Sequence, residues 1–106
     1  ELDTTYTRGV ELLQKRKYAK ALYILNDYND RNTVVAHLSL DHNERAMELL
    51  AAMPKDAVTE YLRAIACSRL GRKAEGREHF LEACRLDGRM EYRGNLDPEI
   101  AELLKQ

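Results

Sequence analysis

The side chains best suited to bind a transition metal in this chain are three histidines and two cysteines. They are His37, His42, His79, Cys67 and Cys84. Zinc sites usually draw their ligands from close pairs such as C-x-x-C, H-x-x-x-H or H-E-x-x-H, and none of these occurs. His37 and His42 span an expected helix end, which does not place both on one face. We therefore expect no metal site and no cofactor, and a partly buried, hydrogen-bonded role for His79.

Covalent catalysis requires a nucleophile, a base and an orienting group in one place. His79 and Cys84 are five residues apart, which separates them by about 140° around a helix. No glycine-rich loop follows a strand, so nucleotide-binding fingerprints are also missing. We expect no catalytic residue and no enzymatic activity. The two cysteines are then reduced thiols in a helical core, with a single disulfide between them as the alternative.

Length and composition describe one globular domain, residues 1–106. Hydrophobic residues make up 44% and charged residues 33%, which excludes a disordered tail. The 17 Lys and Arg against 18 Asp and Glu give a formal charge of −1, which does not favour nucleic-acid binding. No apolar run is long enough to insert into a membrane, so we expect a soluble domain. Because the chain opens at Glu1 without an initiator Met, we expect it to be part of a longer protein.

Helical periodicity runs through almost the whole sequence, and strand signals are nearly absent. It predicts three helix pairs, over about 3–28, 32–53 and 56–87, and a last helix over about 97–105. The expected N-cap of the first helix is Asp3 or Thr4, that of the third is Asn32 and that of the fifth is Asp56. Gly71 and Gly88 are expected to end the two helices of the third pair. Asp97 followed by Pro98 is a strong signal for the start of the last helix.

The helix pairs share one register, which indicates an internal repeat. The second helices overlay at offsets of 25 and 30 residues, through Ala21, Ile24, Leu25 and Tyr28, then Ala46, Leu49, Leu50 and Met53, then Gly76, His79, Phe80 and Ala83. The first helices obey the same offsets, through Tyr6, Gly9, Val10 and Leu13, then Arg31, Val34, Val35 and Leu38, then Tyr61, Ala64, Ile65 and Ser68. Small residues at matched positions allow paired helices to approach closely. A repeated helix pair of this kind is typical of an α-solenoid.

The third pair carries the pattern of a known family. Tyr61, Ala64, Leu70-Gly71 and Gly76, continued by Phe80 and Ala83, resemble a tetratricopeptide repeat (TPR), and Gly9, Tyr18 and Ala21 of the first pair are similar. The resemblance implies an all-α, right-handed superhelix of three TPR-like helix pairs with a C-terminal capping helix. The offsets are shorter than the 34 residues usual in the family, and the middle pair departs most from the pattern.

The TPR resemblance also implies a concave groove that binds an extended or helical peptide. It directs five side chains toward that groove: Tyr6, Gln14, Ser39, Tyr61 and Arg69. The alternative is that the tyrosines pack between repeats. Basic clusters at two matched turns, Lys15–Lys17 and Arg69 with Arg72 and Lys73, would form a positive rim or would offset helix dipoles.

From this resemblance we expect a protein–protein interaction module, a scaffold that binds a peptide or partner protein. The alternative function is an assembly domain that stacks on another copy through its solenoid ends or on the rest of its parent protein. The segments Tyr28–Thr33 and Leu96–Ile100 are also similar to the helical-repeat tails of Bacteroidetes cell-envelope and fimbria-accessory proteins. That second similarity implies a parent protein in the bacterial cell envelope.

Overall fold

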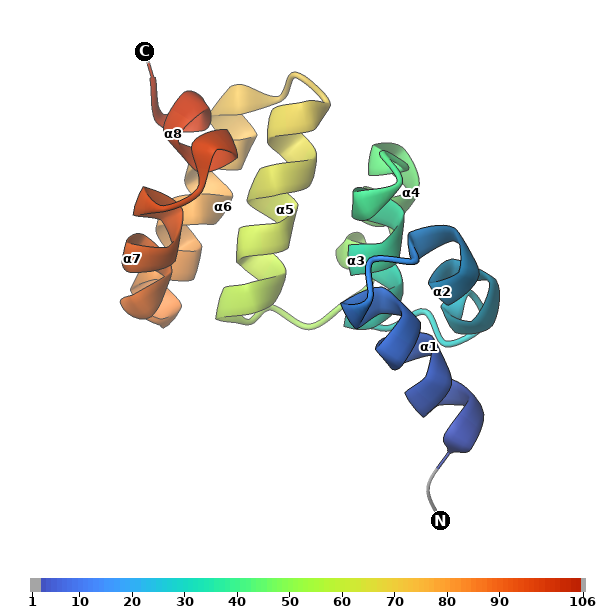
Figure 1. Cartoon of the computed structure of the whole chain (residues 1–106). Coiled ribbons are helices and arrows are strands. Elements are labelled where there is room, and N and C mark those ends of the chain that lie inside the picture. The colour runs from blue at the N-terminus through green and yellow to red at the C-terminus, as the bar shows by residue number, and fades with distance from the viewer. Residues whose placement is uncertain (1–2, 106) are drawn as a thin grey trace. The chain divides into compact units, whose positions relative to one another are not determined.

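The computed structural model describes residues 3–105, which form eight helices joined by short turns (Figure 1). They are α1 (Thr4–Gln14), α2 (Tyr18–Leu25), α3 (Arg31–Ser39), α4 (Asn43–Ala51), α5 (Ala57–Arg69), α6 (Lys73–Leu86), α7 (Arg89–Asn95) and α8 (Pro98–Leu104). The expected all-α class is confirmed for these residues. None of the helices described has the length and apolar character needed to cross a bilayer. The chain divides into two compact units, Glu1–Leu49 and Leu50–Gln106.

In the first unit α1 packs against α2, and α2 packs against α3. Asp3 caps α1, as expected, by accepting a hydrogen bond of 3.1 Å from the backbone N–H of Tyr6. Gly9 is buried where the two helices meet. A Cβ added there would lie only 2.7 Å from Cδ2 of Leu25. The expected close approach at a small residue is therefore confirmed for this pair.

The boundary between α2 and α3 differs from the expected one. The second helix ends at Leu25 rather than near Tyr28, and Asn29 turns the chain with a φ of 52°. Asparagine tolerates this left-handed conformation better than most residues. The N-cap of α3 is Asp30 and not Asn32, because Asp30 and Thr33 form a capping box.

In the second unit α5 and α6 form an antiparallel hairpin (Figure 1). The expected cap Asp56 accepts from the N–H of Thr59 at 2.7 Å. Gly71 follows the end of α5 with a φ of 78°, a conformation that suits glycine. The N–H of Arg72 returns to the carbonyl of Cys67 at 2.8 Å, and that of Gly71 to Ser68 at 3.2 Å. These two bonds form a Schellman motif, which fixes the direction in which α6 begins.

The expectation of three pairs and one terminal helix is wrong in its helix count, because the described chain contains α7 as well. Gly88 does not end a helix in a left-handed conformation; it is the N-cap of α7 and has right-handed helical angles, with a φ of −57° and a ψ of −21°. Asp87 supports this start by accepting from the N–H of Arg89 at 3.0 Å. The helix has seven residues and buries only Met90 and Gly94. So short a stretch carries almost no apolar periodicity.

The core of the second unit joins all four of its helices from α5 onward. Helix α8 lies against α5, α6 and α7. The buried cluster consists of Tyr61, Ala64, Ile65, Phe80, Ala83, Met90, Ile100 and Leu103. The start of α8 is as expected, since Asp97 caps it and Pro98 is its first residue.

Candidate functional site

A buried carboxylate lies in the first turn of α5, where it faces α6. Glu60 on α5 is only 1% exposed. One of its oxygens, Oε1, accepts from Nη1 of Arg63 at 2.7 Å, and the other, Oε2, lies 2.5 Å from Nδ1 of His79 on α6. A buried charge is tolerated only when it is paired and hydrogen-bonded. Both oxygens of Glu60 meet this requirement, and the expected hydrogen-bonded role of His79 is confirmed.

Arg63 is itself held in place from a second side. Its Nη2 donates to the carbonyls of Leu50 and Met53, at 2.5 and 2.9 Å. The guanidinium therefore links the start of the second unit to Glu60. Because Arg63 is fixed, Glu60 is fixed, and Glu60 in turn orients the imidazole of His79.

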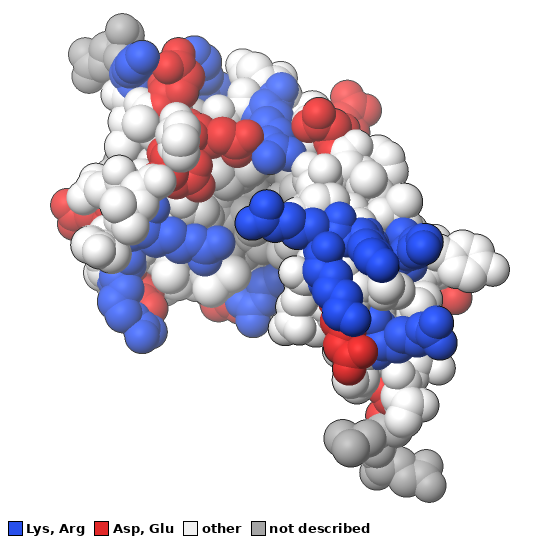
Figure 2. All heavy atoms as spheres, in the orientation of Figure 1, with Lys and Arg blue, Asp and Glu red and all other residues white. Residues whose placement is uncertain are grey.

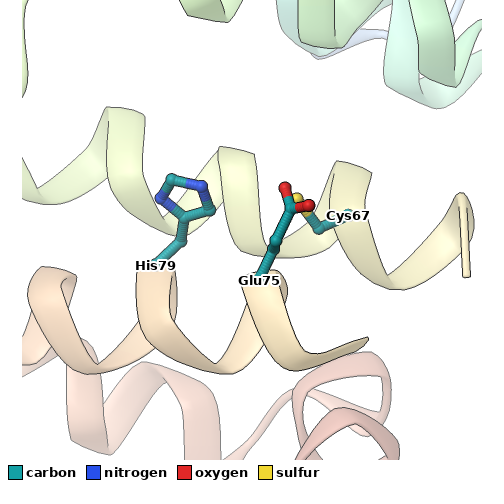
Figure 3. Close-up of side chains that lie close together, drawn as sticks. All are labelled: Cys67, Glu75 and His79. Atoms are coloured by element: carbon teal, nitrogen blue, oxygen red, sulfur yellow. The ribbon is translucent and has the colours of Figure 1, made fainter. Parts of the chain in front are cut away.

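Cys67, Glu75 and His79 come together beside this carboxylate (Figure 3). One ligand atom of each lies within 4.8 Å of those of the other two. Cys67 is on α5, while Glu75 and His79 are four residues apart on one face of α6. Burial, and then the nearby carboxylates of Glu75 and Glu60, raise the pKa of the Cys67 thiol.

Two features of the backbone create this cluster. The Schellman motif at Gly71 ties the carbonyl of Cys67 to the start of α6. Gly76 then lets the helices touch, since an added Cβ would lie 3.3 Å from both the Ala64 oxygen and Cys67 Cβ. The close contact expected at Gly76 is confirmed. Glu75 is next to Gly76 in sequence, so the same contact brings it near Cys67.

Sequence reasoning missed this cluster because it counted only histidines and cysteines as ligands. Glu75 and His79 form an E-x-x-x-H spacing on a helix, which was a readable signal. Cys67 lies on the neighbouring helix, across a turn, so no short motif contains all three residues. The hairpin had to be folded before the three could be grouped.

A second feature is a cleft between α1 and α2 in the first unit, with a volume of about 810 Å³. Its lining is polar at the edge and apolar beneath, and consists of Thr4, Thr5, Arg8, Leu12, Lys17, Lys20, Tyr23 and Ile24. Lys and Arg side chains gather over this part of the chain in Figure 2. Within residues 3–105, Arg8, Lys17 and Lys20 form no ion pair. The cleft is therefore a positively charged surface whose cations are available to a ligand.

Tyr23 is the one aromatic residue among the described residues that line the cleft. Its side chain is 89% exposed. It also borders a second, more apolar hollow of about 620 Å³, lined by Ala19, Leu22, Tyr23, Asn26, Asp27, Leu40 and His42. A smaller hollow next to the cleft shares Thr4 and Arg8 with it and is also lined by Thr7 and Glu11. The ring of Tyr23 thus stands between two hollows, where it offers a large contact area with a polar tip.

The two tyrosines among the five groove residues expected from the sequence make hydrogen bonds within the chain. Tyr61 is 1% exposed, and its hydroxyl donates to Asp97 Oδ2 at 2.7 Å. Burial, and then this hydrogen bond, raise the pKa of Tyr61 well above its ordinary value. The hydroxyl of Tyr6 donates to Asp30 and accepts from Asn32. These contacts agree with the alternative in which the tyrosines serve packing.

The other three expected residues are exposed. Gln14 and Ser39 lie on the surface of the first unit. Arg69 lies on the surface of the second unit, where its Nε pairs with Oε1 of Glu99 at 3.0 Å. Tyr6, Gln14 and Ser39 therefore belong to one compact unit, and Tyr61 and Arg69 to the other.

The two cysteines are free thiols. Cys67 is buried, and Cys84 is partly buried against the core of the second unit. The disulfide considered as the alternative does not form in this structure.

Comparison of the chain with family models, with curated proteins and with solved structures finds no match.

Proposed function

We propose that this chain is a protein-interaction domain that binds an acidic segment of a partner protein in the cleft between α1 and α2. The observation that carries the proposal is the grouping of Arg8, Lys17 and Lys20 around the exposed ring of Tyr23. Such a surface matches a peptide that alternates carboxylates with apolar side chains. The apolar floor of Leu12 and Ile24 favours a peptide over a uniformly charged polymer.

Charge and shape have different roles in this mode of binding. Exposed cations steer an acidic partner to the surface and set the orientation, while each exposed ion pair adds little affinity. Burial of apolar area against Tyr23, Leu12 and Ile24 would supply most of the binding energy. Aromatic residues and Arg are the types that most often dominate such interfaces.

For the finer fold we propose a TPR-like solenoid, in which α1 and α2 form one repeat and α5 and α6 another. The close contacts at Gly9 and at Gly76 support this proposal, because both occur at the small positions of the repeat pattern.

The test uses a fluorescent peptide in which Glu and Asp alternate with Leu and Phe, titrated with the chain and followed by anisotropy. We expect saturable binding that weakens as salt is added. A Lys17→Glu, Lys20→Glu variant should bind about tenfold more weakly or worse. Lys73→Glu is the control for a single charge reversal outside the cleft, to be compared with Lys17→Glu and Lys20→Glu made singly, since Lys73 is an exposed lysine at the first position of α6.

Two results would contradict this function. One is equal loss of affinity in Lys73→Glu and in the single cleft variants, which would indicate a general effect of charge. The other is equally effective competition by double-stranded DNA at the same concentration of negative charge. That outcome would show that the surface binds any polyanion.

A second candidate is the assembly domain, which the exposed apolar residues in and between the last two helices favour. Tyr92 is 71% exposed, Leu96 is 70% exposed and Leu104 is 42% exposed. Light scattering over a wide range of concentrations separates the two functions. A constant mass of 12.3 kDa favours binding to a foreign partner, whereas a mass that rises with concentration favours self-assembly.

A further inference from the structure

We propose that Cys67, Glu75 and His79 form a Zn²⁺ site in the α5–α6 hairpin, with the fourth coordination position open to solvent. The three ligand atoms already lie within 4.8 Å of one another (Figure 3). This inference goes beyond the proposed peptide binding and rests on different residues, in a different unit of the chain.

The ligand types suit zinc. Thiolate, imidazole and carboxylate are its three usual protein ligands, with bonds of about 2.0–2.3 Å. Around a tetrahedral ion, ligand atoms are then on the order of 3–4 Å apart. Only a small contraction of the cluster is needed, and Glu75 can supply it because its side chain is exposed. Three protein ligands with a free position are characteristic of open zinc sites.

The surroundings of His79 match those usual for a zinc-bound histidine. A metal-bound histidine generally uses its other ring nitrogen to bind a carboxylate, which fixes the ring. His79 Nδ1 binds the buried carboxylate of Glu60 at 2.5 Å. Figure 3 shows the other ring nitrogen turned toward Glu75 and Cys67. The imidazole is therefore held in the orientation that a metal at this site requires.

The charges also balance. Glu60 is paired with Arg63, so this pair adds no net charge near the site. The thiolate of Cys67 and the carboxylate of Glu75 would together offset the two charges of Zn²⁺, while His79 binds as a neutral ligand. Binding displaces the thiol proton of Cys67 to solvent. The ion and its three ligands together carry no net charge, which suits the buried position of Cys67, and the nearby charge of Arg72 favours the thiolate.

Co²⁺ is the probe that tests this site, because cobalt bound by a thiolate gives a charge-transfer band in the near ultraviolet. The chain is treated with a chelator, desalted and titrated with Co²⁺, and Zn²⁺ is then added. We expect one Co²⁺ per chain, a thiolate band, and loss of that band when Zn²⁺ replaces cobalt. Zn²⁺ alone should raise the unfolding temperature, since it binds the folded state.

Variants identify the ligands. Cys67→Ser should abolish the band, whereas Cys84→Ser, which alters the other free thiol of the same hairpin, should keep it. His79→Gln is a second test. His79 is partly exposed, so this substitution should disturb the core less than a change at Cys67. It should weaken Zn²⁺ binding at least about tenfold. Circular dichroism checks that each variant is helical. The proposal is overturned if the unaltered chain shows no thiolate band, or if Cys67→Ser or His79→Gln binds as tightly as the parent.

Discussion

The hydroxyl of Tyr61 donates a hydrogen bond of 2.7 Å to Oδ2 of Asp97, the residue that caps α8. Tyr6 makes the same contact with Asp30, the residue that caps α3. The repeat pattern of the sequence places Tyr6 and Tyr61 at matched positions. In each compact unit, a tyrosine of the first helix therefore fixes the start of a later helix. The recurrence supports the proposal that both units derive from one repeated motif.

Replacement of Tyr61 by Phe removes this contact and leaves the ring in place. A hydrogen bond to a charged group contributes about 1.5–3 kcal/mol, and we expect a loss of that size in the free energy of unfolding. Tyr61→Ala also removes the buried ring and should cost about 3–5 kcal/mol. Urea denaturation measures both.

Tyr28→Phe is the matched control for Tyr61→Phe. Tyr28 donates to the α1 cap Asp3 at 2.7 Å, but this pair is exposed to water. Its loss should change the midpoint of unfolding far less. Equal effects of the two substitutions would show that burial of the Tyr61–Asp97 contact has no energetic importance.

Replacement of Glu60 by Ala leaves the guanidinium of Arg63 buried without its carboxylate. Breaking a buried ion pair costs about 3–5 kcal/mol, and Glu60→Gln should cost less because an amide still accepts a hydrogen bond. Glu82→Ala is the control, since Glu82 pairs with Lys55 and Arg85 at the surface. Thermal unfolding should show a large change for Glu60→Ala and a small one for Glu82→Ala. The reverse order would contradict the role assigned to Glu60.

Substitution by Ala should affect the stability of the protein differently at two glycines, Gly88 and Gly94. A Cβ at Gly94 would lie 2.5 Å from two ring atoms of Phe80, so Gly94→Ala must displace a core side chain and should cost about 1–3 kcal/mol. At Gly88 an added Cβ meets nothing within 4 Å. Its φ of −57° also suits any residue, so Gly88→Ala should be neutral or mildly stabilising. Chemical denaturation of both variants tests this contrast, and equal losses would contradict the packing of α7.

Because the side chain of His37 is buried, we expect the protein to be less stable in mild acid. Burial, followed by the charges of His42 and Arg45, lowers the pKa of His37. The unfolded chain then binds a proton more readily than the folded chain. Stability should be complete above pH about 6.5, the ordinary value for histidine, and should fall as the pH decreases below it. In His37→Leu this decrease should be smaller; an unchanged pH dependence would assign it to other groups.

Local signals in the sequence predicted most helices and several of their ends. The caps expected at Asp3, Asp56 and Asp97 are confirmed. They were predictable because a short acidic side chain just before a helix accepts a hydrogen bond from a free backbone N–H of its first turn. Gly71 was predictable for a similar reason, since its position after α5 requires a positive φ. Gly88 was expected to end a helix in the same way, but its φ is −57°, and the sequence did not predict the helix α7 that follows it.

The candidate sites were less predictable, since they depend on contacts between helices. The burial of Tyr61 depends on α8, whose Asp97 is 36 residues away in the chain. The approach of Glu75 to Cys67 depends on the Schellman turn and on Gly76. Helical periodicity identifies the face on which a residue lies, but it does not identify which element covers that face.

A residue-resolved NMR titration with the acidic peptide tests the proposed binding site most directly. Binding in the cleft predicts that amide shift changes concentrate on α1 and α2, around Arg8, Lys17, Lys20 and Tyr23. Shift changes confined to Ala57–Leu104, or no change at saturating peptide, would contradict the assignment of the α1–α2 cleft as the interaction site.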